Sequence, residues 1–275
     1  MNSEYEVSSE IYEEHDYTCK SKAIVNNDNI VSRFVFTLKP EKTEPDEDGD
    51  LQVTRRKSVE KCIEIEHSKS TVLKLVGLQI WRGAFLLADW LIECADNFPK
   101  DCIILELAAG VGLTSVIASM YAKVYSTDVN RGELFRLIES NYKRNKHLCK
   151  HPLKVAEIDF MSSNLSREIL AILPKVSYII AADVVYDNEL TKAFVNTVDL
   201  LLSVPPQRSI VIALEKRFVF TLADFDSVAP CYDYFVDCLK SLKNVTFEEI
   251  DCDFPQYFKY DRVKQLVLWK ITSKF

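Results

Sequence analysis

Short apolar runs and longer amphipathic segments alternate along the chain from residue 81 onward. Apolar runs typical of buried strands occupy residues 102–107, 124–128, 153–158, 176–183 and 209–215. Apolar positions at helical spacing occupy residues 81–97, a stretch after Gly112, 131–147, 163–171, 188–203 and 229–242. This alternation predicts an α/β fold with a mostly parallel sheet covered by helices on both faces. Two strands then follow without a helix between them, at residues 245–252 and 263–271, and predict a closing antiparallel hairpin.

A different pattern precedes this region. Residues 1–29 are polar and acidic without sustained periodicity, so we expect a flexible N-terminal segment. The pattern of a strand occurs at three places: residues 30–38, 63–65 and 71–80. It predicts a small β extension over residues 30–80, interrupted by a solvated acidic loop at 39–50. Residues 81–275 then form the main domain.

The composition of the 275-residue chain supports one globular body with a small extension. Hydrophobic residues make up 48% of it, which is enough for a full core. The formal net charge of −7 argues against a broad basic face, so we expect no direct binding of nucleic acid, although Arg55, Arg56 and Lys57 form a local basic patch. An acidic protein favours basic partners.

The distribution of cysteines and the composition of the N-terminus indicate the cellular compartment of the protein. The eight cysteines include no C-x-x-C pair, which is typical of a reducing compartment. The N-terminus lacks the features of a signal or transit peptide, and no apolar run approaches the roughly 18 residues that span a bilayer. We expect an intracellular protein of the nucleus or cytoplasm without membrane contact. The four histidines have no cysteine or carboxylate at ligand spacing, so we expect no metal site.

The stretch CIILELAAGVGLTSVIA (102–118) places two of the six glycines directly after the first strand of the main domain. Ligands of open parallel sheets bind outside the carboxyl ends of the strands, near this first turn. Gly110 and Gly112 allow positive φ and close approach of a ligand there, although an ordinary tight turn is the alternative. Asp128 ends the second strand, where it can accept hydrogen bonds from a ribose or cap the helix near Arg131.

These glycines leave two adenosine cofactors open. Residues 110–115 nearly satisfy the dinucleotide fingerprint, with serine at the third small position, so a nicotinamide-dependent oxidoreductase is one interpretation. Glu106 favours the other. A carboxylate just before the loop would repel a pyrophosphate, whereas it suits the ammonium group of S-adenosyl-L-methionine.

Six motifs occur in the order seen in methyltransferase family sixteen: LQIWRGAFLLADWL, ILELAAGVGLTS, YSTDVN, AEIDF, IIAADVVYDNEL and ALEKR. This family consists of seven-strand, S-adenosylmethionine-dependent protein-lysine methyltransferases, and the chain resembles it over roughly residues 70–275. The resemblance implies a Rossmann-like sheet with strand order 3-2-1-4-5-7-6, in which strand 7 is antiparallel. It also implies S-adenosyl-L-methionine as cofactor and S-adenosyl-L-homocysteine as product.

The resemblance further implies a set of cofactor-binding residues. They are Trp81, Glu106, Ala108, Ala109, Gly110, Gly112, Asp128, Asp159, Phe160 and Ala182. In the family, the residue matching Trp81 closes over the cofactor and the residue matching Asp128 holds the ribose. Asp159 matches the acid that meets the adenine amino group, with Phe160 beside it, and Ala182 lines the adenine side.

Two residues are implied to act at the reacting end. Asp183 and Tyr186 match the family's Asp-x-x-Tyr motif beside the transferable methyl group, where we expect Asp183 to orient the substrate amine and Tyr186 to bound the slot. We expect Asp183→Ala to abolish transfer and to leave cofactor binding largely intact. Without the resemblance, Asp183 is equally a helix cap and Tyr186 a packing residue. Glu215 and Arg217 match the family's Glu-x-Arg pattern.

Two positions depart from the family pattern. Ala108 stands where the Glu-x-Gly-x-Gly-x-Gly motif has its first glycine, which a methyl group permits if φ there is negative. Phe160 stands where the family usually has tryptophan, so it can still stack but lacks the indole N–H. Neither change is expected to destroy the site, and both can weaken cofactor affinity.

The predicted activity is methyl transfer to a lysine side chain of a protein substrate that is basic around the target. A lysine ammonium has no lone pair, so it must lose its proton and be held in line with the sulfonium methyl bond. We expect the protein to act as a monomer. Three alternatives stay open: an inactive methyltransferase-fold binding module, a small-molecule methyltransferase and the nicotinamide-dependent oxidoreductase.

Overall fold

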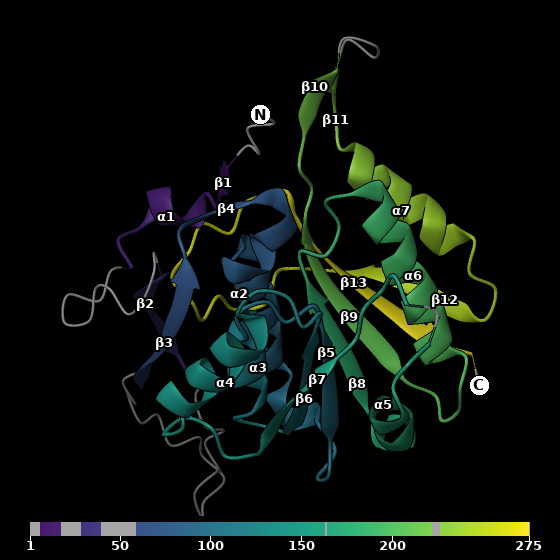
Figure 1. Cartoon of the computed structure of the whole chain (residues 1–275), viewed down its shortest axis with the longest axis horizontal. Coiled ribbons are helices and arrows are strands. Elements are labelled where there is room, and N and C mark those ends of the chain that lie inside the picture. Colours follow the sequence, from purple (N-terminus) through teal and green to yellow (C-terminus); the bar gives the residue numbers. More distant parts are fainter. Residues whose placement is uncertain (1–5, 18–28, 40–58, 163, 222–225, 275) are drawn as a thin grey trace, which may run out of the picture.

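A seven-stranded mixed sheet forms the centre of the protein (Figure 1). The computed structural model describes residues 6–17, 29–39, 59–162, 164–221 and 226–274. The strands of the sheet are β5 (Ile103–Leu107), β6 (Lys123–Asp128), β7 (Leu153–Glu157), β8 (Tyr178–Ala182), β9 (Ser209–Glu215), β12 (Val245–Ile250) and β13 (Leu266–Ser273). Their order is β12-β13-β9-β8-β5-β6-β7, and β13 is antiparallel to both of its neighbours. Numbered along the chain this order is 3-2-1-4-5-7-6, which confirms the predicted topology.

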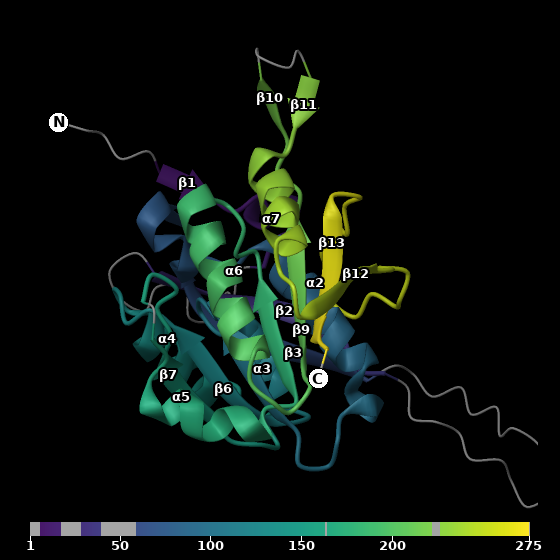
Figure 2. The same ribbon diagram turned by 90° about the vertical axis from the view of Figure 1, so that its right-hand side faces the viewer.

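Helices cover both faces of the sheet (Figures 1 and 2). One face carries α2 (Arg82–Glu93), α3 (Leu113–Ala118) and α4 (Leu134–Arg144). The other carries α5 (Arg167–Ile172), α6 (Asn188–Leu202) and α7 (Pro230–Lys240). Because both faces are covered, the central strands are apolar throughout rather than alternating, and Ile179, Ile180 and Ala181 of β8 are all fully buried.

The stretch Leu73–Glu93 is long and apolar enough to cross a membrane by length and composition, with a mean hydropathy of 1.4 in its most apolar window. Lys74, Arg82 and Asp89 interrupt it, which is why no continuous apolar run marks it in the sequence. Of that window, 72% is buried inside the protein. The apolar side chains of α2 pack in the core beside the sheet and α3, as those of a core helix do.

An antiparallel hairpin forms the first half of the predicted β extension. Its strands are β2 (Asn29–Thr37) and β3 (Glu60–Ser68). The side-chain amide of Asn141 on α4 bonds the N–H and C=O of Glu66 at 2.8 and 3.0 Å. The amide of Asn145 bonds those of Glu64 at 2.9 and 2.7 Å. These amides pair the outer edge of β3 as another strand would, so they hold the hairpin on α4.

The second half of the extension differs from the predicted β structure over residues 71–80. The strand there is Ser70–Val72 (β4), and Leu73–Leu78 forms a 3₁₀ helix (η1). β4 pairs with β1 (Glu6–Ser8), which is three residues long, so the ladder ends at Val72. The backbone beyond has no partner strand and coils over the main domain, where its groups find other partners. The prediction is therefore wrong for residues 73–80.

The N-terminal segment also differs from the expected flexible tail. Its described part, residues 6–17, contains β1 and the short helix α1 (Ile11–Glu14). Ile11 is fully buried in the core, and the Tyr12 ring stacks on His67 with ring centroids 4.9 Å apart. Apolar and aromatic side chains among the acids anchor the segment, and composition averaged over 29 residues conceals them. The rest of the predicted flexible segment lies outside the described residues.

We expect Ile11→Ala to lower the free energy of unfolding by about 2–4 kcal/mol, because it removes buried apolar area and leaves a cavity. Glu13→Ala, at an exposed position of the same helix, should change it by less than about 0.5 kcal/mol. Urea denaturation followed by circular dichroism measures both. Equal midpoints for the two variants would contradict the docking of this segment.

A small hairpin that the sequence pattern did not predict follows β9. β10 (Val219–Thr221) and β11 (Asp226–Val228) pair with each other and stand clear of the body of the protein (Figures 1 and 2). Strands of three residues are too short for alternation to reveal. The hairpin rises from the carboxyl end of β9, the edge of the sheet at which the parallel strands end.

Candidate active site

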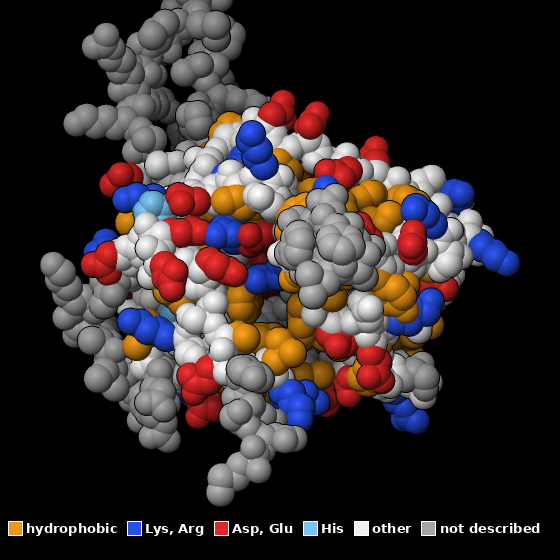
Figure 3. Space-filling view, turned by 90° about the horizontal axis from the view of Figure 1, so that it is seen from above, with side chains coloured by type: hydrophobic (Ala, Val, Ile, Leu, Met, Phe, Trp, Pro, Cys, Tyr) orange, Lys and Arg blue, Asp and Glu red, His pale blue; other side chains and the backbone are white. Residues whose placement is uncertain are grey.

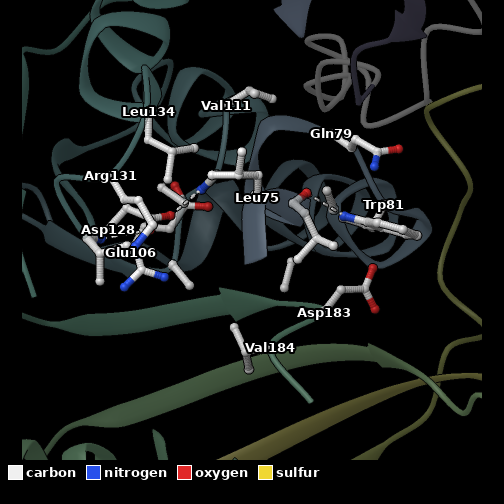
Figure 4. Close-up of a pocket in the computed structure, with 18 of the residues that line it drawn as sticks. Leu75, Gln79, Trp81, Glu106, Val111, Asp128, Arg131, Leu134, Asp183 and Val184 are labelled. Atoms are coloured by element: carbon white, nitrogen blue, oxygen red, sulfur yellow. Dashed lines mark hydrogen bonds between the residues drawn. The ribbon is translucent and has the colours of Figure 1, made fainter. Parts of the chain in front are cut away.

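A pocket opens where β5, β6 and β8 end, on the edge of the sheet at which the chain order reverses about β5. Its walls come from η1 and the start of α2, the loop after β5, and the loops after β7 and β8. Figure 4 shows Glu106, Asp128 and Arg131 at one end, and Trp81 and Asp183 at the other. Of the residues that the family resemblance implies, all of the cofactor-binding ones except Gly112 line this pocket, as do Asp183 and Tyr186, whereas Glu215 and Arg217 do not.

The glycine loop after β5 comes close to η1. Gly110 has a φ of +56°, and a Cβ there would lie 2.8 Å from the carbonyl oxygen of Gly77. Position 110 therefore requires glycine, both for its left-handed backbone and for the close approach of the two chains. Gly77 is not among the residues predicted from the sequence, because it lies within the segment 71–80, whose pattern predicts β structure.

Gly112 is not among the residues that line the pocket. It precedes α3 with a φ of +82°, and a Cβ there would lie 3.2 Å from Cγ2 of Ile138 on α4. The glycine thus allows α3 and α4 to pack closely. Its assignment as a cofactor-binding residue stays a prediction.

Ala108 lines the pocket with a φ of +49°. The condition stated for tolerating alanine there, a negative φ, is therefore not met. The left-handed conformation strains a residue with a Cβ by roughly 1 kcal/mol or more. The position keeps the backbone shape of a glycine loop at the expense of local strain.

Ala108→Gly is expected to raise the free energy of unfolding by about 0.5–1 kcal/mol, because glycine adopts this φ without strain. Ala109→Gly provides the matched control. Ala109 is not among the residues with positive φ, so the same change there should destabilise the protein by a similar amount. Thermal unfolding of the two variants measures the difference, and shifts of equal sign would contradict this account.

Glu106 is buried beneath the glycine loop, near the end of β5. Its carboxylate accepts hydrogen bonds from the hydroxyl groups of Thr114 and Ser115 on α3. Burial raises the pKa of Glu106 to about 7 despite these two donors, and the nearby charge of Asp128 adds to the rise. The carboxyl group can therefore change its charge near neutral pH.

Asp128 is the last residue of β6. Its two carboxylate oxygens accept the backbone N–H groups of Gly110 at 2.8 Å and Val129 at 2.7 Å. Burial raises its pKa to about 6. Because α4 begins only at Leu134, Asp128 does not cap that helix, and the alternative interpretation is wrong.

Three further predicted residues line the wall beyond Asp128. Asp159 and Phe160 follow β7, and Ala182 ends β8. One carboxylate oxygen of Asp159 accepts the N–H of Met161 at 2.9 Å, which orders the loop. The Phe160 ring packs edge-on against Phe194 with centroids 5.3 Å apart, so it is held in place by α6.

Trp81 stands directly before α2 and contributes to the opposite end of the pocket. Its indole N–H donates to the carbonyl of Val76 in η1 at 3.0 Å. The guanidinium of Arg217 lies over the indole ring, 4.6 Å from its centroid, and pairs with Glu10 at 3.2 Å. Trp81 is therefore fixed by η1 and by the chain that follows β9.

Asp183 joins the first turn of α2 to the end of β9. One carboxylate oxygen accepts the N–H of Gly83 at 2.6 Å and the other accepts the N–H of Glu215 at 3.0 Å. A Cβ on Gly83 would lie 2.6 Å from the Asp183 carboxylate, so this contact requires glycine at position 83. Burial raises the pKa of Asp183, opposed by Arg217 and by the two N–H donors.

Asp183 does not cap the following helix. Asp187 does so, because its side chain accepts the N–H of Leu190 at 2.9 Å in the first turn of α6. The helix-cap alternative for Asp183 is therefore wrong. Tyr186 lines the pocket between these acids, and burial raises its pKa to about 12, so its hydroxyl stays protonated at neutral pH.

A charged cluster beside Asp183 was not predicted as a unit. The buried guanidinium of Arg82 forms ion pairs with Glu14 of α1 and Glu215 of β9. It thereby joins the N-terminal segment, α2 and the sheet. The sequence does contain hints of this cluster, namely Arg82 inside an apolar helix and Glu215 at the end of a strand. It does not indicate that they pair, because Glu14 and Glu215 lie 68 and 133 positions away from Arg82.

Comparison with known proteins identifies the group to which this arrangement belongs. A family model described as lysine methyltransferase matches residues 58–229, which is more than half of the chain. The chain belongs to this lysine methyltransferase family. Methyltransferase-like protein 22 of mouse is 36% identical over 233 residues, which cover 76% of this chain and 59% of the mouse protein. Its human counterpart is 34% identical over 252 residues, covering 83% and 62%.

The chain of this lysine methyltransferase family member thus spans about three-fifths of the length of those relatives. The mouse protein-lysine methyltransferase METTL21E is 34% identical over 128 residues, covering 46% of this chain and 51% of that protein. Among solved structures, the N-methyltransferase NodS of Bradyrhizobium japonicum in complex with S-adenosyl-L-homocysteine is 14% identical. The superposition has a TM-score of 0.43 and covers 70% of this chain and 86% of NodS.

Proposed function

We propose that the protein transfers a methyl group from S-adenosyl-L-methionine to a lysine side chain of a protein substrate. The observation that carries the proposal is the shape and chemistry of the pocket, with Asp128 at one end and Asp183 beside Trp81 at the other (Figure 4). One end offers a carboxylate to a ribose, and the other offers a carboxylate and aromatic rings to a cationic amine. Membership of the lysine methyltransferase family supports the same activity.

The residues of the pocket fit the proposed cofactor. Each Asp128 oxygen accepts one backbone N–H, which leaves lone pairs for the two hydroxyls of a ribose. The buried Glu106 carboxylate would face the ammonium group, and the Asp159 carboxylate would accept the adenine amino group. Phe160 and Ala182 supply apolar surface for the adenine ring. When bound, the cofactor supplies an electrophilic methyl group on a sulfonium.

The protein's own groups position the amine at the other end. Two lone-pair sites of Asp183 are occupied by backbone N–H groups, so further sites remain to accept an N–H of the substrate amine. Tyr186 keeps its proton near neutral pH and therefore bounds the slot without acting as a base. Alignment of the amine with the methyl group is worth several kcal/mol of the barrier.

Two measurements test the proposal. Calorimetry with S-adenosyl-L-homocysteine and with NAD separates the two cofactor interpretations, and binding of NAD alone would end the methyltransferase case. Incubation of the protein with methyl-labelled cofactor and a mammalian cell lysate, followed by acid hydrolysis, should yield labelled methyl-lysine. Cofactor binding without any transfer would favour the inactive binding module, and label confined to the low-mass fraction would favour a small-molecule substrate.

Affinity for S-adenosyl-L-homocysteine should fall by about tenfold between pH 8 and pH 6. The pKa of Glu106 is raised to about 7, so the free pocket carries the proton below that pH, whereas the ammonium group favours the carboxylate. Cofactor binding must then remove the proton from Glu106, so the affinity for the cofactor decreases as the pH falls. Glu106→Gln should flatten the profile to the smaller change from Asp128, whose pKa is about 6. Calorimetry between pH 6 and pH 8 measures the affinity of the wild type and of the variant. If the affinity of the variant depends on pH as strongly as that of the wild type, Glu106 does not contact the ammonium group.

A further inference from the structure

Three residues separate the pocket-side end of β9 from the hairpin β10–β11. Arg217, which covers Trp81, is followed directly by Phe218 and Val219, whose side chains are 53% and 48% exposed. Of the large apolar residues that are exposed in the described part of the chain, these two are consecutive in the sequence and the others are not. Successive side chains of an extended strand point to opposite sides, so the two residues offer apolar surface on both sides of the hairpin's base.

The base of the hairpin is held firmly although its strands project. The Lys216 ammonium lies over the Tyr232 ring of α7, 4.6 Å from its centroid, and the Lys216 N–H donates to Gln265 at 2.9 Å. Arg217 is fixed by Trp81 and Glu10. Phe218 and Val219 are therefore presented from a fixed base beside the reacting end of the pocket.

The surface between the hairpin and α1 carries an excess of negative charge. Four carboxylates, those of Glu10, Glu14, Asp183 and Glu215, share two guanidiniums, those of Arg82 and Arg217, which leaves a net charge of −2 when all are ionised. One oxygen each of Glu14 and Glu215 is buried without a hydrogen-bond partner. Acidic side chains also gather on the left side of this face, the side on which α1 lies, and hydrophobic ones border the central hollow (Figure 3).

We propose that the base of hairpin β10–β11 is the docking surface for the protein substrate, with apolar residues of the substrate packing on Phe218 and Val219 and basic residues facing the carboxylates beside α1. This inference rests on the proposed function and adds the sequence class of the target: a lysine with apolar residues on one side and basic residues on the other. Each strand of the hairpin pairs with the other alone among the described residues, so its outer edges are open to an extended polypeptide.

The test uses the full chain with both apolar side chains replaced, Phe218→Ser with Val219→Ser. Leu170→Ser with Val204→Ser is the matched control, because both residues are also exposed. Leu170 belongs to α5, which precedes β8, and Val204 lies between α6 and the start of β9, whereas the hairpin follows the end of β9. Methyl-lysine formation is measured from labelled cofactor with increasing amounts of mammalian lysate, which gives a relative kcat/KM. Calorimetry with S-adenosyl-L-homocysteine reports the integrity of the cofactor site, and light scattering reports the oligomeric state.

We expect the hairpin variant to lose at least tenfold in kcat/KM while its affinity for S-adenosyl-L-homocysteine stays within twofold of the wild type. The control pair should retain both. A kcat/KM within twofold of the wild type in the hairpin variant would overturn the docking surface alone. A wild-type dimer that becomes a monomer in this variant would also overturn it, because the surface would then bind a second copy. Absence of methyl-lysine with the wild type would instead refute the proposed function on which the inference rests.

Discussion

Asp183→Ala is expected to reduce methyl transfer at least a hundredfold and to lower the free energy of unfolding by roughly 3 kcal/mol. The carboxylate holds the N–H of Gly83 and the N–H of Glu215, which belong to different elements. Hydrogen bonds to a charged group contribute about 1.5–3 kcal/mol each, and alanine leaves both donors without a partner. Activity assays and urea denaturation measure the two effects.

This expectation revises the one drawn from the sequence, which left cofactor binding largely intact in Asp183→Ala. The start of α2 carries Trp81, so loosening the contact at Gly83 should also weaken affinity for S-adenosyl-L-homocysteine. Asp187→Ala is the matched control, because that carboxylate also accepts one backbone N–H but lies at the exposed start of α6. It should cost about 1 kcal/mol of stability and keep the affinity. Full turnover in Asp183→Ala would show that neither the amine nor α2 depends on this carboxylate.

Asp128→Ala should weaken binding of S-adenosyl-L-homocysteine by a factor of at least about 100. The change removes the acceptor proposed for both ribose hydroxyls, and it also frees the N–H of Gly110 from the contact that shapes the glycine loop. Two hydrogen bonds to a charged group together account for about 3 kcal/mol or more, which corresponds to this factor. Isothermal calorimetry measures the loss directly.

Glu157→Ala is the control for this second experiment. Glu157 lies opposite Asp128 in the sheet register, is exposed, and accepts the N–H of Asn130 at 3.0 Å. It is not among the residues that line the pocket. Its replacement should leave the affinity within about twofold. Equal losses in the two variants would indicate a general effect of charge at this edge rather than a ribose contact.

Most of the fold and most of the site were predictable from the sequence. The alternation of strands and helices indicates a parallel sheet, and carboxyl ends of parallel strands meet at one edge. Residues at or just beyond the ends of β5, β6, β7 and β8 therefore had to come near one another, as Gly110, Asp128, Asp159 and Asp183 do. The family resemblance supplied the order of the strands, which local alternation alone leaves open.

The errors lie where a residue's role depends on partners far away in the chain. A Cβ at position 112 would meet Ile138 of α4, and Ala108 has a positive φ that no composition rule reveals. The η1 helix lies over Gly110 because β1, the partner strand of β4 and only three residues long, ends the β ladder before η1 begins. The acidic composition of residues 1–29 had indicated a flexible segment there and not a strand. In each case the local pattern was interpreted without the surface against which the segment packs.

The sequence by itself determined the class of the fold, the edge of the sheet at which chemistry is located, and the residue types available there, because these depend on local periodicity and on the directions of parallel strands. Only the tertiary structure decided how those residues are held. Asp183 meets Gly83 across 100 positions and Arg82 meets Glu14 across 68, and such contacts arise from packing between distant elements, which no period of 2 or 3.6 residues encodes.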